Sequence, residues 1–161
     1  MKTALCSPIN LILEKTSQVP YFTDMRRVLQ ALEISVADYD WYISDIETNY
    51  NSPDFPTDDH WVCGEALQQF LAENEIQFIW AVFSAVPKGL RPPVQNPPYI
   101  DGNPRYWKGE EVSPQLNGAI FEIACWDSSA TILVGLPPKA AAAFVKAYPD
   151  TRALNSAPDA L

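Results

Sequence analysis

Residues 76–86 read IQFIWAVFSAV, and this stretch is the longest apolar run in the chain. Alternate positions of a strand point to opposite faces, and here both sets are apolar. Phe78 and Trp80 fall on one face, whereas Ile79 and Phe83 fall on the other. A strand that is apolar on both faces is typical of the inside of a covered sheet. The sequence therefore predicts a central strand that is covered above and below.

The sequence on either side of this strand predicts four further strands and three helices. Apolar residues recur at helical spacing in two stretches before it, and two consecutive prolines open a helix near the end of the chain. The predicted strands are 3–13, 39–47, 118–126 and 131–136, and the predicted helices are 20–34, 63–74 and 137–146. This order predicts an α+β fold, in which a mixed or mostly antiparallel sheet of about five strands carries about three helices on one face.

The chain has the size and composition of a single globular domain. It has 161 residues, of which 47% are hydrophobic, so it can bury a core without disulfides or metals. We place the domain at residues 1–150 and expect a C-terminal tail at 151–161. Residues 87–114 hold seven of the 15 prolines and three of the six glycines, which predicts a long proline-rich loop. Because this loop is also cationic and aromatic, it could bind a ligand, cover the sheet edge or pack on the acidic part of the chain.

Acidic residues are concentrated in one window of the sequence. No Lys or Arg occurs between Arg27 and Lys88, whereas this window holds 11 of the 20 Asp and Glu residues. The rest of the chain holds the other nine acids and all 11 Lys and Arg residues. Its nominal charge is therefore +2, whereas that of the whole chain is −9. A negative surface repels phosphate backbones and anionic membranes, which argues against nucleic acid and membrane as partners. The pattern indicates a basic protein as the partner.

Glycine and cysteine spacing argues against the common cofactor sites. The six glycines are never closer than seven residues apart, so the glycine-rich loops that bind dinucleotides or phosphates are absent. Cys6, Cys63 and Cys125 are odd in number and form no C-x-x-C motif, which favours buried thiols over a disulfide framework or a zinc knuckle. We expect no cofactor and no metal. Polar residues interrupt the apolar start of the chain, which predicts a cytoplasmic protein.

Residues 38–61 form the candidate binding surface. Carboxylates among large aromatic side chains combine long-range attraction with rigid contact groups of the kind that dominate interfaces. The candidate partner-binding residues are Asp40, Tyr42, Asp45, Glu47, Asp54, Asp58, Asp59 and Trp61. The competing interpretation is that the aromatic residues face the core while the acids only keep the protein soluble.

A hydrolase is the alternative function. His60 is the only histidine and lies three residues before Cys63. With nearby carboxylates, this pair could form a nucleophilic site or bind a metal. No second pair of ligands occurs at a recognisable spacing, so we favour a protein that is not an enzyme. A further alternative is a homodimer that buries Trp41 or Trp61.

Four short motifs carry a family resemblance. They are YDWYI at 39–43, GEAL at 64–67, AVPKG at 85–89 and CWD at 125–127. Together they resemble a small bacterial family with a domain of unknown function, over about residues 20–136. The chain departs from that family in the proline-rich insert after Gly89 and in its C-terminal tail. The resemblance implies a bacterial cytoplasmic α+β domain and no catalytic residues.

The chain also resembles, in type only, the immunity proteins of bacterial toxin systems, which are small and acidic. The charge pattern and this likeness lead to one prediction. We expect an immunity protein that neutralises a basic bacterial toxin through the acidic and aromatic surface, as a monomer or a homodimer.

Overall fold

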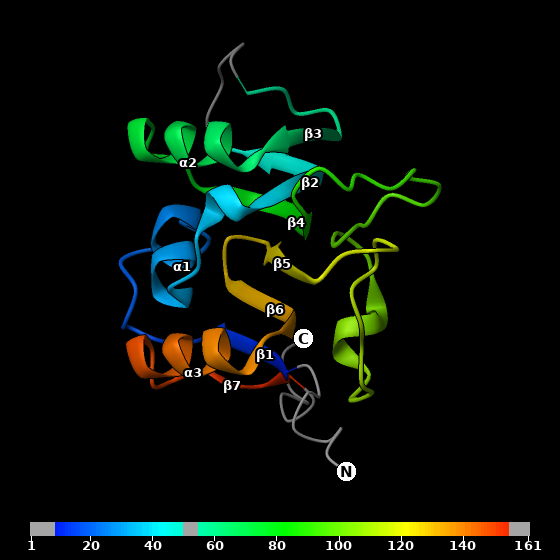
Figure 1. Cartoon of the computed structure of the whole chain (residues 1–161). Helices are drawn as coiled ribbons and strands as arrows, with labels where there is room; N and C mark the ends of the chain where they lie inside the picture. The colour runs from blue at the N-terminus through cyan, green and yellow to red at the C-terminus, as the bar shows by residue number, and fades with distance from the viewer. Residues whose placement is uncertain (1–8, 50–54, 155–161) are drawn as a thin grey trace.

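One antiparallel sheet runs through the protein. The computed structural model describes residues 9–49 and 55–154. Its seven strands follow the order β3-β2-β4-β5-β6-β1-β7, and the neighbouring strands are antiparallel (Figure 1). They are β1 (Ile9–Glu14), β2 (Tyr39–Thr48), β3 (His60–Cys63), β4 (Phe78–Pro87), β5 (Phe121–Trp126), β6 (Ala130–Leu136) and β7 (Arg152–Ala153).

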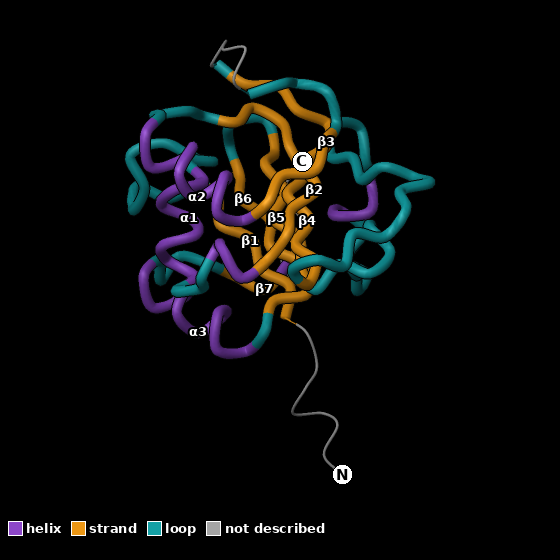
Figure 2. The backbone as a smooth tube through the Cα atoms, turned by 45° about the horizontal axis from the view of Figure 1, so that its top comes forward, coloured by secondary structure: helices purple, strands orange, loops and turns teal. Residues whose placement is uncertain are grey.

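Three α-helices cover one face of the sheet. They are α1 (Met25–Leu32), α2 (Gly64–Glu73) and α3 (Pro138–Ala147), with two short 3-10 helices, η2 (Val36–Asp38) and η3 (Pro104–Trp107). Figure 2 shows the α-helices on one side of the strands and the long connection between β4 and β5 on the other. Among the described residues, no helix combines the length and the apolar character that crossing a membrane requires.

The expected number of strands, about five, is wrong. The structure adds β3 and β7, which lie at the two edges of the sheet. β3 occupies four residues that end where the expected helix 63–74 begins, and β7 occupies two residues of the expected tail. Strands this short hold too few residues to show an alternating pattern in the sequence. The α+β class and the three helices are confirmed, and the sheet is antiparallel throughout the described residues.

The helix-side core follows the apolar spacing of the sequence. Met25, Val28 and Leu32 recur on one face of α1, and each is at least 94% buried. They pack in one cluster with Trp41 of β2. The indole nitrogen of Trp41 donates a hydrogen bond to the carbonyl oxygen of Val36 at 3.1 Å, so the one polar group of this buried ring is satisfied.

Residues 88–120, hereafter the covering segment, form the layer on the opposite face. Ile100, Tyr106 and Leu116 are buried. They pack on apolar side chains of the sheet that include Val82 and Val86 of β4. The central strand is therefore covered on both faces, as its sequence predicts, although one cover has almost no regular secondary structure.

The expected alternation is wrong at Phe78, which packs on the helix side with Phe83, whereas Trp80 packs under the covering segment. The reason is the register shift between β2 and β4 beside these two residues.

Gly64 allows α2 to lie close to η2. A Cβ atom at this position would be 2.1 Å from the carbonyl oxygen of Val36 and 2.5 Å from that of Tyr39. Both contacts are with backbone, which cannot move aside as a flexible side chain can. The absence of a side chain at Gly64 thus fixes the distance between α2 and the turn that follows α1.

Candidate partner-binding surface

A bulge in β2 brings several acidic residues together. The pairing of β2 with β4 shifts register around Asp45, which has a φ of +55°. The Asp45 carboxylate accepts hydrogen bonds from the backbone amides of Ile100 at 2.8 Å and Asp101 at 2.9 Å. The backbone amide of Asp45 donates to Oδ1 of Asp59 at 3.1 Å. Three separate stretches of the chain therefore meet at this bulge.

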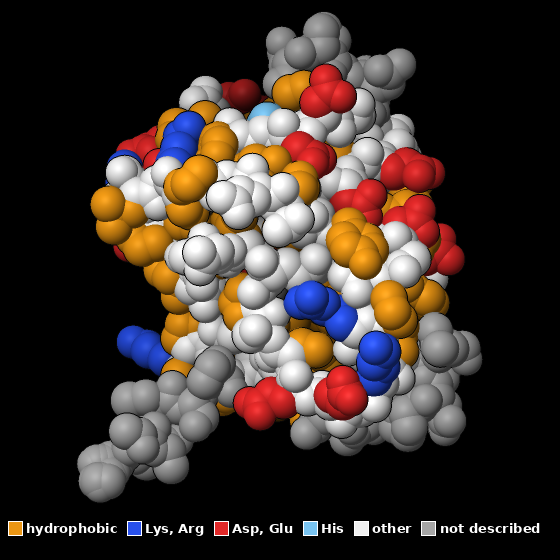
Figure 3. Space-filling model, turned by 90° about the vertical axis from the view of Figure 1, so that its right-hand side faces the viewer, with side chains coloured by type: hydrophobic (Ala, Val, Ile, Leu, Met, Phe, Trp, Pro, Cys, Tyr) orange, Lys and Arg blue, Asp and Glu red, His pale blue; other side chains and the backbone are white. Residues whose placement is uncertain are grey.

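We call the resulting group the acidic rim. Its members are Asp45, Glu47, Asp58, Asp59 and Asp101. All of them except the half-buried Asp45 are exposed. The ion pairs formed among the described residues involve other carboxylates, those of Asp24, Glu65, Asp40 and Glu14. Figure 3, which faces the covering segment, shows Asp and Glu side chains gathered on one side of this face. The acidic rim therefore presents charge that the described basic residues do not neutralise through ion pairs.

Tyr99 places an exposed aromatic ring beside the acidic rim. It precedes Ile100, whose amide binds Asp45, and 48% of its surface is exposed. Its backbone is held on both sides by Gln115, which accepts from the Tyr99 amide at 3.1 Å and donates to the Tyr99 carbonyl oxygen at 2.9 Å. Tyr99 is thus a large contact group on a fixed backbone, and it was not among the expected site residues.

Asp40, expected to contact a partner, is used inside the protein. It is 5% exposed. Its carboxylate accepts hydrogen bonds from Nε of Arg91 at 2.9 Å and from the amide of Gly89 at 3.2 Å. The bond from Arg91 holds the pKa of the Asp40 carboxyl below its usual range. Asp40 is buried because side chains alternate between the two faces of a strand. Its side chain points to the covered face of β2, and the chain that leaves β4 returns over this face.

Of the two expected aromatic anchors, one is buried and one is accessible. Tyr42 is 7% exposed and belongs to the core under the covering segment. Trp61, opposite Tyr42 on β3, is half-buried, and the two ring centroids are 5.1 Å apart. The Arg91 guanidinium lies 5.5 Å from the centre of the Trp61 ring. The Arg91 guanidinium therefore already covers part of the Trp61 ring, and only the rest of the ring is accessible to a partner.

Glu122 is a buried carboxylate whose structural role the sequence does not reveal. It is 1% exposed and lies on β5 beneath the covering segment. Its oxygens accept hydrogen bonds from the amides of Gln115 at 2.6 Å and Leu116 at 2.8 Å, and from the Ser84 hydroxyl at 2.8 Å. Burial raises the pKa of Glu122, and these three donors act in the opposite direction. Like Asp40 and Asp45, Glu122 accepts hydrogen bonds from backbone amides of the covering segment. In a helix or a strand, such amides would bond to backbone carbonyl oxygens instead.

Three tryptophans form a half-buried cluster next to the acidic rim. The rings of Trp80 and Trp126 are 6.1 Å apart, and those of Trp107 and Trp126 are 5.0 Å apart. Trp80 lies opposite Glu47 in the pairing of β4 with β2. Trp107 belongs to η3, so its position beside two sheet residues depends on the path of the covering segment. We did not expect this cluster, because the sequence of the segment gives no register against the sheet.

His60 and Cys63, the pair behind the hydrolase alternative, lie on opposite faces of β3. His60 pairs with Ile43 and contacts the ring of Phe55 on the helix side, whereas Cys63 pairs with Asp40 on the covered side. Nδ1 of His60 is 2.7 Å from the carbonyl oxygen of Asp58. Residues three apart share a face in a helix but not in a strand.

The described residues show no metal site and two free thiols. Within residues 9–49 and 55–154, no group of three or more His, Cys, Asp or Glu side chains is arranged to hold a metal ion. Cys125 is a buried free thiol and Cys63 is a half-buried one. Cys6 and the candidate residue Asp54 lie outside the described residues.

Comparison with known proteins adds no relative. No protein-family model, no curated protein and no solved structure matches this chain. The resemblance suggested by the four short motifs stays a prediction, and the functional argument depends on the surface itself.

Proposed function

We propose that this protein binds a basic protein through the acidic rim, and that it acts as an immunity protein which neutralises a basic bacterial toxin. The observation that carries the proposal is the group Glu47, Asp58, Asp59 and Asp101, four exposed carboxylates beside Asp45 that make no ion pair with the described Lys and Arg residues. Like charges held together reduce the stability of the folded state. A cluster of this kind therefore favours a role outside the molecule.

The aromatic residues next to the rim supply the contacts that electrostatic attraction lacks. Charge complementarity accelerates encounter, whereas large rigid side chains that lose contact with water slow dissociation. Tyr99 is exposed beside the rim, and Trp80 lies opposite Glu47. Both replace the buried Tyr42 as candidate anchors. A basic surface that covers the rim would cover these rings as well.

Paired charge reversals test the proposal. The bait proteins are the wild type, the rim variant Glu47→Lys/Asp58→Lys, and the control Glu110→Lys/Glu111→Lys, which makes the same charge change at two exposed acids of the covering segment. Neither Glu47 nor Asp58 uses its side chain in a hydrogen bond among the described residues, so folding should be preserved. Proteins captured by each bait from the native host would be identified by mass spectrometry.

We expect a basic protein to be captured by the wild type and by the control but not by the rim variant. With that protein in hand, the rim variant should associate about tenfold more slowly at low salt and show a weaker dependence of the rate on ionic strength. Equal capture by all three baits, or a partner without a basic surface, would contradict the proposal. Loss of the toxic activity of the partner on binding distinguishes an immunity protein from a binding protein of another kind.

A further inference from the structure

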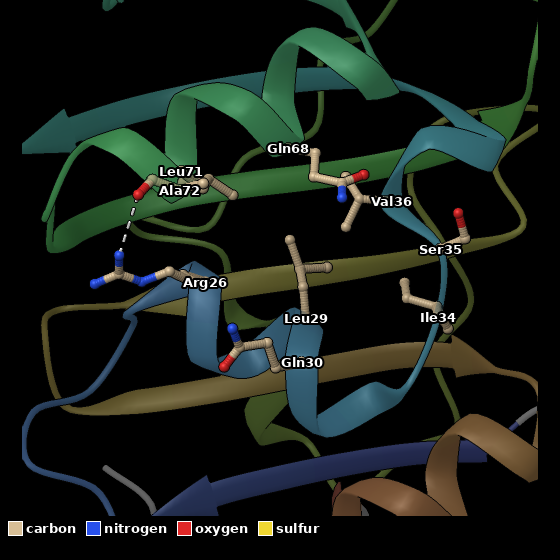
Figure 4. Close-up of a pocket in the computed structure, with 9 residues that line it drawn as sticks. All are labelled: Arg26, Leu29, Gln30, Ile34, Ser35, Val36, Gln68, Leu71 and Ala72. Atoms are coloured by element: carbon tan, nitrogen blue, oxygen red, sulfur yellow. Dashed lines mark hydrogen bonds between the residues drawn. The ribbon is translucent and has the colours of Figure 1, made fainter.

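A small groove lies between α1 and α2, on the helix side of the sheet and away from the covering segment. Its volume is about 250 Å³. The residues that line it are Arg26, Leu29, Gln30, Ile34, Ser35, Val36, Gln68, Leu71 and Ala72 (Figure 4). One water molecule occupies ~30 Å³ in the liquid, so the groove has room for on the order of eight water molecules. Cavities that take drug-sized ligands start at about 300 Å³. The groove is smaller than that, so its volume suits a smaller molecule.

The chain itself crosses the groove at both ends. At one end the Arg26 side chain reaches from α1 to α2, where its guanidinium lies 3.5 Å from the carbonyl oxygen of Ala72. At the other end residues 34–36 cross from α1 towards η2 (Figure 4). An extended peptide needs a groove that is open at its ends. A short ligand that enters from the side needs no such opening.

The lining combines an apolar floor with polar walls. Leu29, Val36 and Leu71 are each at least 92% buried and form the floor. Gln30 on α1 and Gln68 on α2 stand on opposite walls, and their carboxamides form no hydrogen bond with the described residues. A ligand would therefore meet an apolar surface below and free hydrogen-bonding groups on each side.

The only charged residue in the lining is a cation. Arg26 is half-buried and is not part of an ion pair among the described residues. No Asp or Glu among the described residues lines the groove, although the chain has 20 acids and a net charge of −9. Guanidinium groups pair with carboxylates through short charge-assisted hydrogen bonds, and partial burial strengthens such bonds. The charge in the groove is thus opposite to that of the molecule as a whole.

We infer that this groove binds a small amphipathic carboxylate, with the carboxylate on Arg26 and an aliphatic chain on Leu29, Leu71 and Val36. Because the chain crosses both ends of the groove, we expect a free small molecule and not a peptide. The groove is on the helix side, so the inference is independent of the acidic rim. Its failure would leave the proposed function untouched, and the reverse also holds.

Two probes of the same length and opposite charge test this inference. Octanoate and octylamine would be titrated into the whole protein by calorimetry, and their sites mapped from backbone amide shifts in NMR spectra. We expect octanoate to bind with one-to-one stoichiometry, at least about tenfold more tightly than octylamine, because one charge-assisted hydrogen bond contributes on that order. The shifts should be confined to α1, residues 34–36 and α2.

Three variants give matched controls. Arg26→Glu should reverse the preference, so that octylamine binds more tightly than octanoate. Lys139→Glu makes the same charge change at the start of α3, away from the groove, and should leave the preference unchanged. Ala72→Trp adds bulk from an exposed position at the mouth and should abolish binding of both probes. Any variant would be used only after its thermal unfolding is shown to match the wild type.

Several outcomes would overturn the inference, and some need no variant. Equal affinity of the wild type for the two probes would do so, as would shifts that map outside the groove. Binding of octanoate with several equivalents, unchanged in Ala72→Trp, would show detergent-like association instead of a site. An unchanged preference in Arg26→Glu would remove Arg26 as the group that selects the ligand.

Discussion

The acidic residues of this protein have two roles, and their backbone positions decide which. Asp40 and Asp45 lie five residues apart on β2 and both accept hydrogen bonds from backbone amides of the covering segment. Glu47 is only two residues further along and is exposed. Strand alternation directs Asp40 inwards, and the bulge at Asp45 resets the alternation before Glu47. Similar side chains therefore stabilise the fold at one place and remain free for a partner at another.

Asp40 provides a prediction about pH. The pKa of Asp40 is lowered from the model-compound value of 3.8 in the folded state, so folding releases a proton and the carboxylate stabilises the native state above pH 3.8. We expect Asp40→Asn to lower the free energy of unfolding by about 1 kcal/mol near neutral pH, a modest value because Arg91 is partly exposed. The difference between wild type and variant should stay constant above about pH 5 and disappear as the pH falls below 3.8, through the lowered pKa. Urea unfolding across this range measures it.

Glu110→Gln is the control for this prediction, since Glu110 is exposed and forms no ion pair among the described residues. Its free energy of unfolding should match that of the wild type at every pH. A gap between wild type and Asp40→Asn that stayed constant with pH would mean that the charge of Asp40 contributes nothing, and that the loss comes from hydrogen bonds which an amide nitrogen cannot accept.

The sequence could predict the concentration of charge but not the position of each carboxylate. The window between Arg27 and Lys88 identifies the acidic part of the chain, and Glu47, Asp58 and Asp59 are exposed there as a binding surface requires. Asp40 and Tyr42 are internal because the covering segment returns over them. That contact joins residues about fifty positions apart, such as Asp40 and Arg91, and no local pattern encodes it.

At the level of elements, the covering segment replaces a layer of regular structure. Its backbone amides bind carboxylates of the sheet, and its buried residues include Ile100, Asn103, Tyr106 and Leu116. In the structure this segment packs on the covered face of the sheet, where it also contacts Asp40 and Asp45 of the acidic window. A connection of this length is usually a mobile surface loop. Here it has the burial and hydrogen bonding of a core element.

Proteolysis tests whether the covering segment is as firmly held as these contacts imply. It contains three sites for trypsin, at Lys88, Arg105 and Lys108, because Pro92 blocks cleavage after Arg91. Cleavage requires local unfolding of several residues, which buried anchors oppose. We expect cleavage in the segment to rise with urea in parallel with global unfolding. Rapid cleavage without urea, while the circular dichroism of the sheet persists, would show that the segment opens on its own.

The regular elements could be predicted because their patterns are local. The helix spacing of Met25, Val28 and Leu32 and the two-sided apolar pattern of residues 76–86 each need only a short window. β3 and β7 could not be predicted in the same way. Their four and two residues become strands only because β2 and β1 are already in place beside them, which is a tertiary effect.

At the level of the whole molecule, the net charge of −9 places a cost on stability. The acids used internally offset this cost by binding amides or cations, as Asp45 and Asp40 do. The exposed members of the acidic rim make no ion pair with the described residues, so they reduce this electrostatic cost very little. If they are kept for binding, their removal should leave the protein as stable as before, or more stable, while it weakens association.

Asp58→Lys makes this expectation measurable. Because Asp58 is exposed beside Asp59, we expect the substitution to raise the free energy of unfolding by up to about 0.5 kcal/mol at low salt. The gain should shrink towards zero as salt rises to about 1 M, where the screening length falls to about 3 Å. Asp58→Asn should give about half of the gain. A clear loss of stability in Asp58→Lys at low salt would instead assign Asp58 a structural role.

The shortness of the two outermost strands limits how copies of this protein can associate. A sheet grows by adding a strand to an unpaired edge, and long flat edges are the usual starting point of fibres. β3 offers only four residues to such an addition, directly after two acids, Asp58 and Asp59. A second copy aligned there would place carboxylate against carboxylate. Repulsion between those carboxylates opposes such an alignment, so growth of the sheet at β3 is disfavoured by charge as well as by the shortness of the strand.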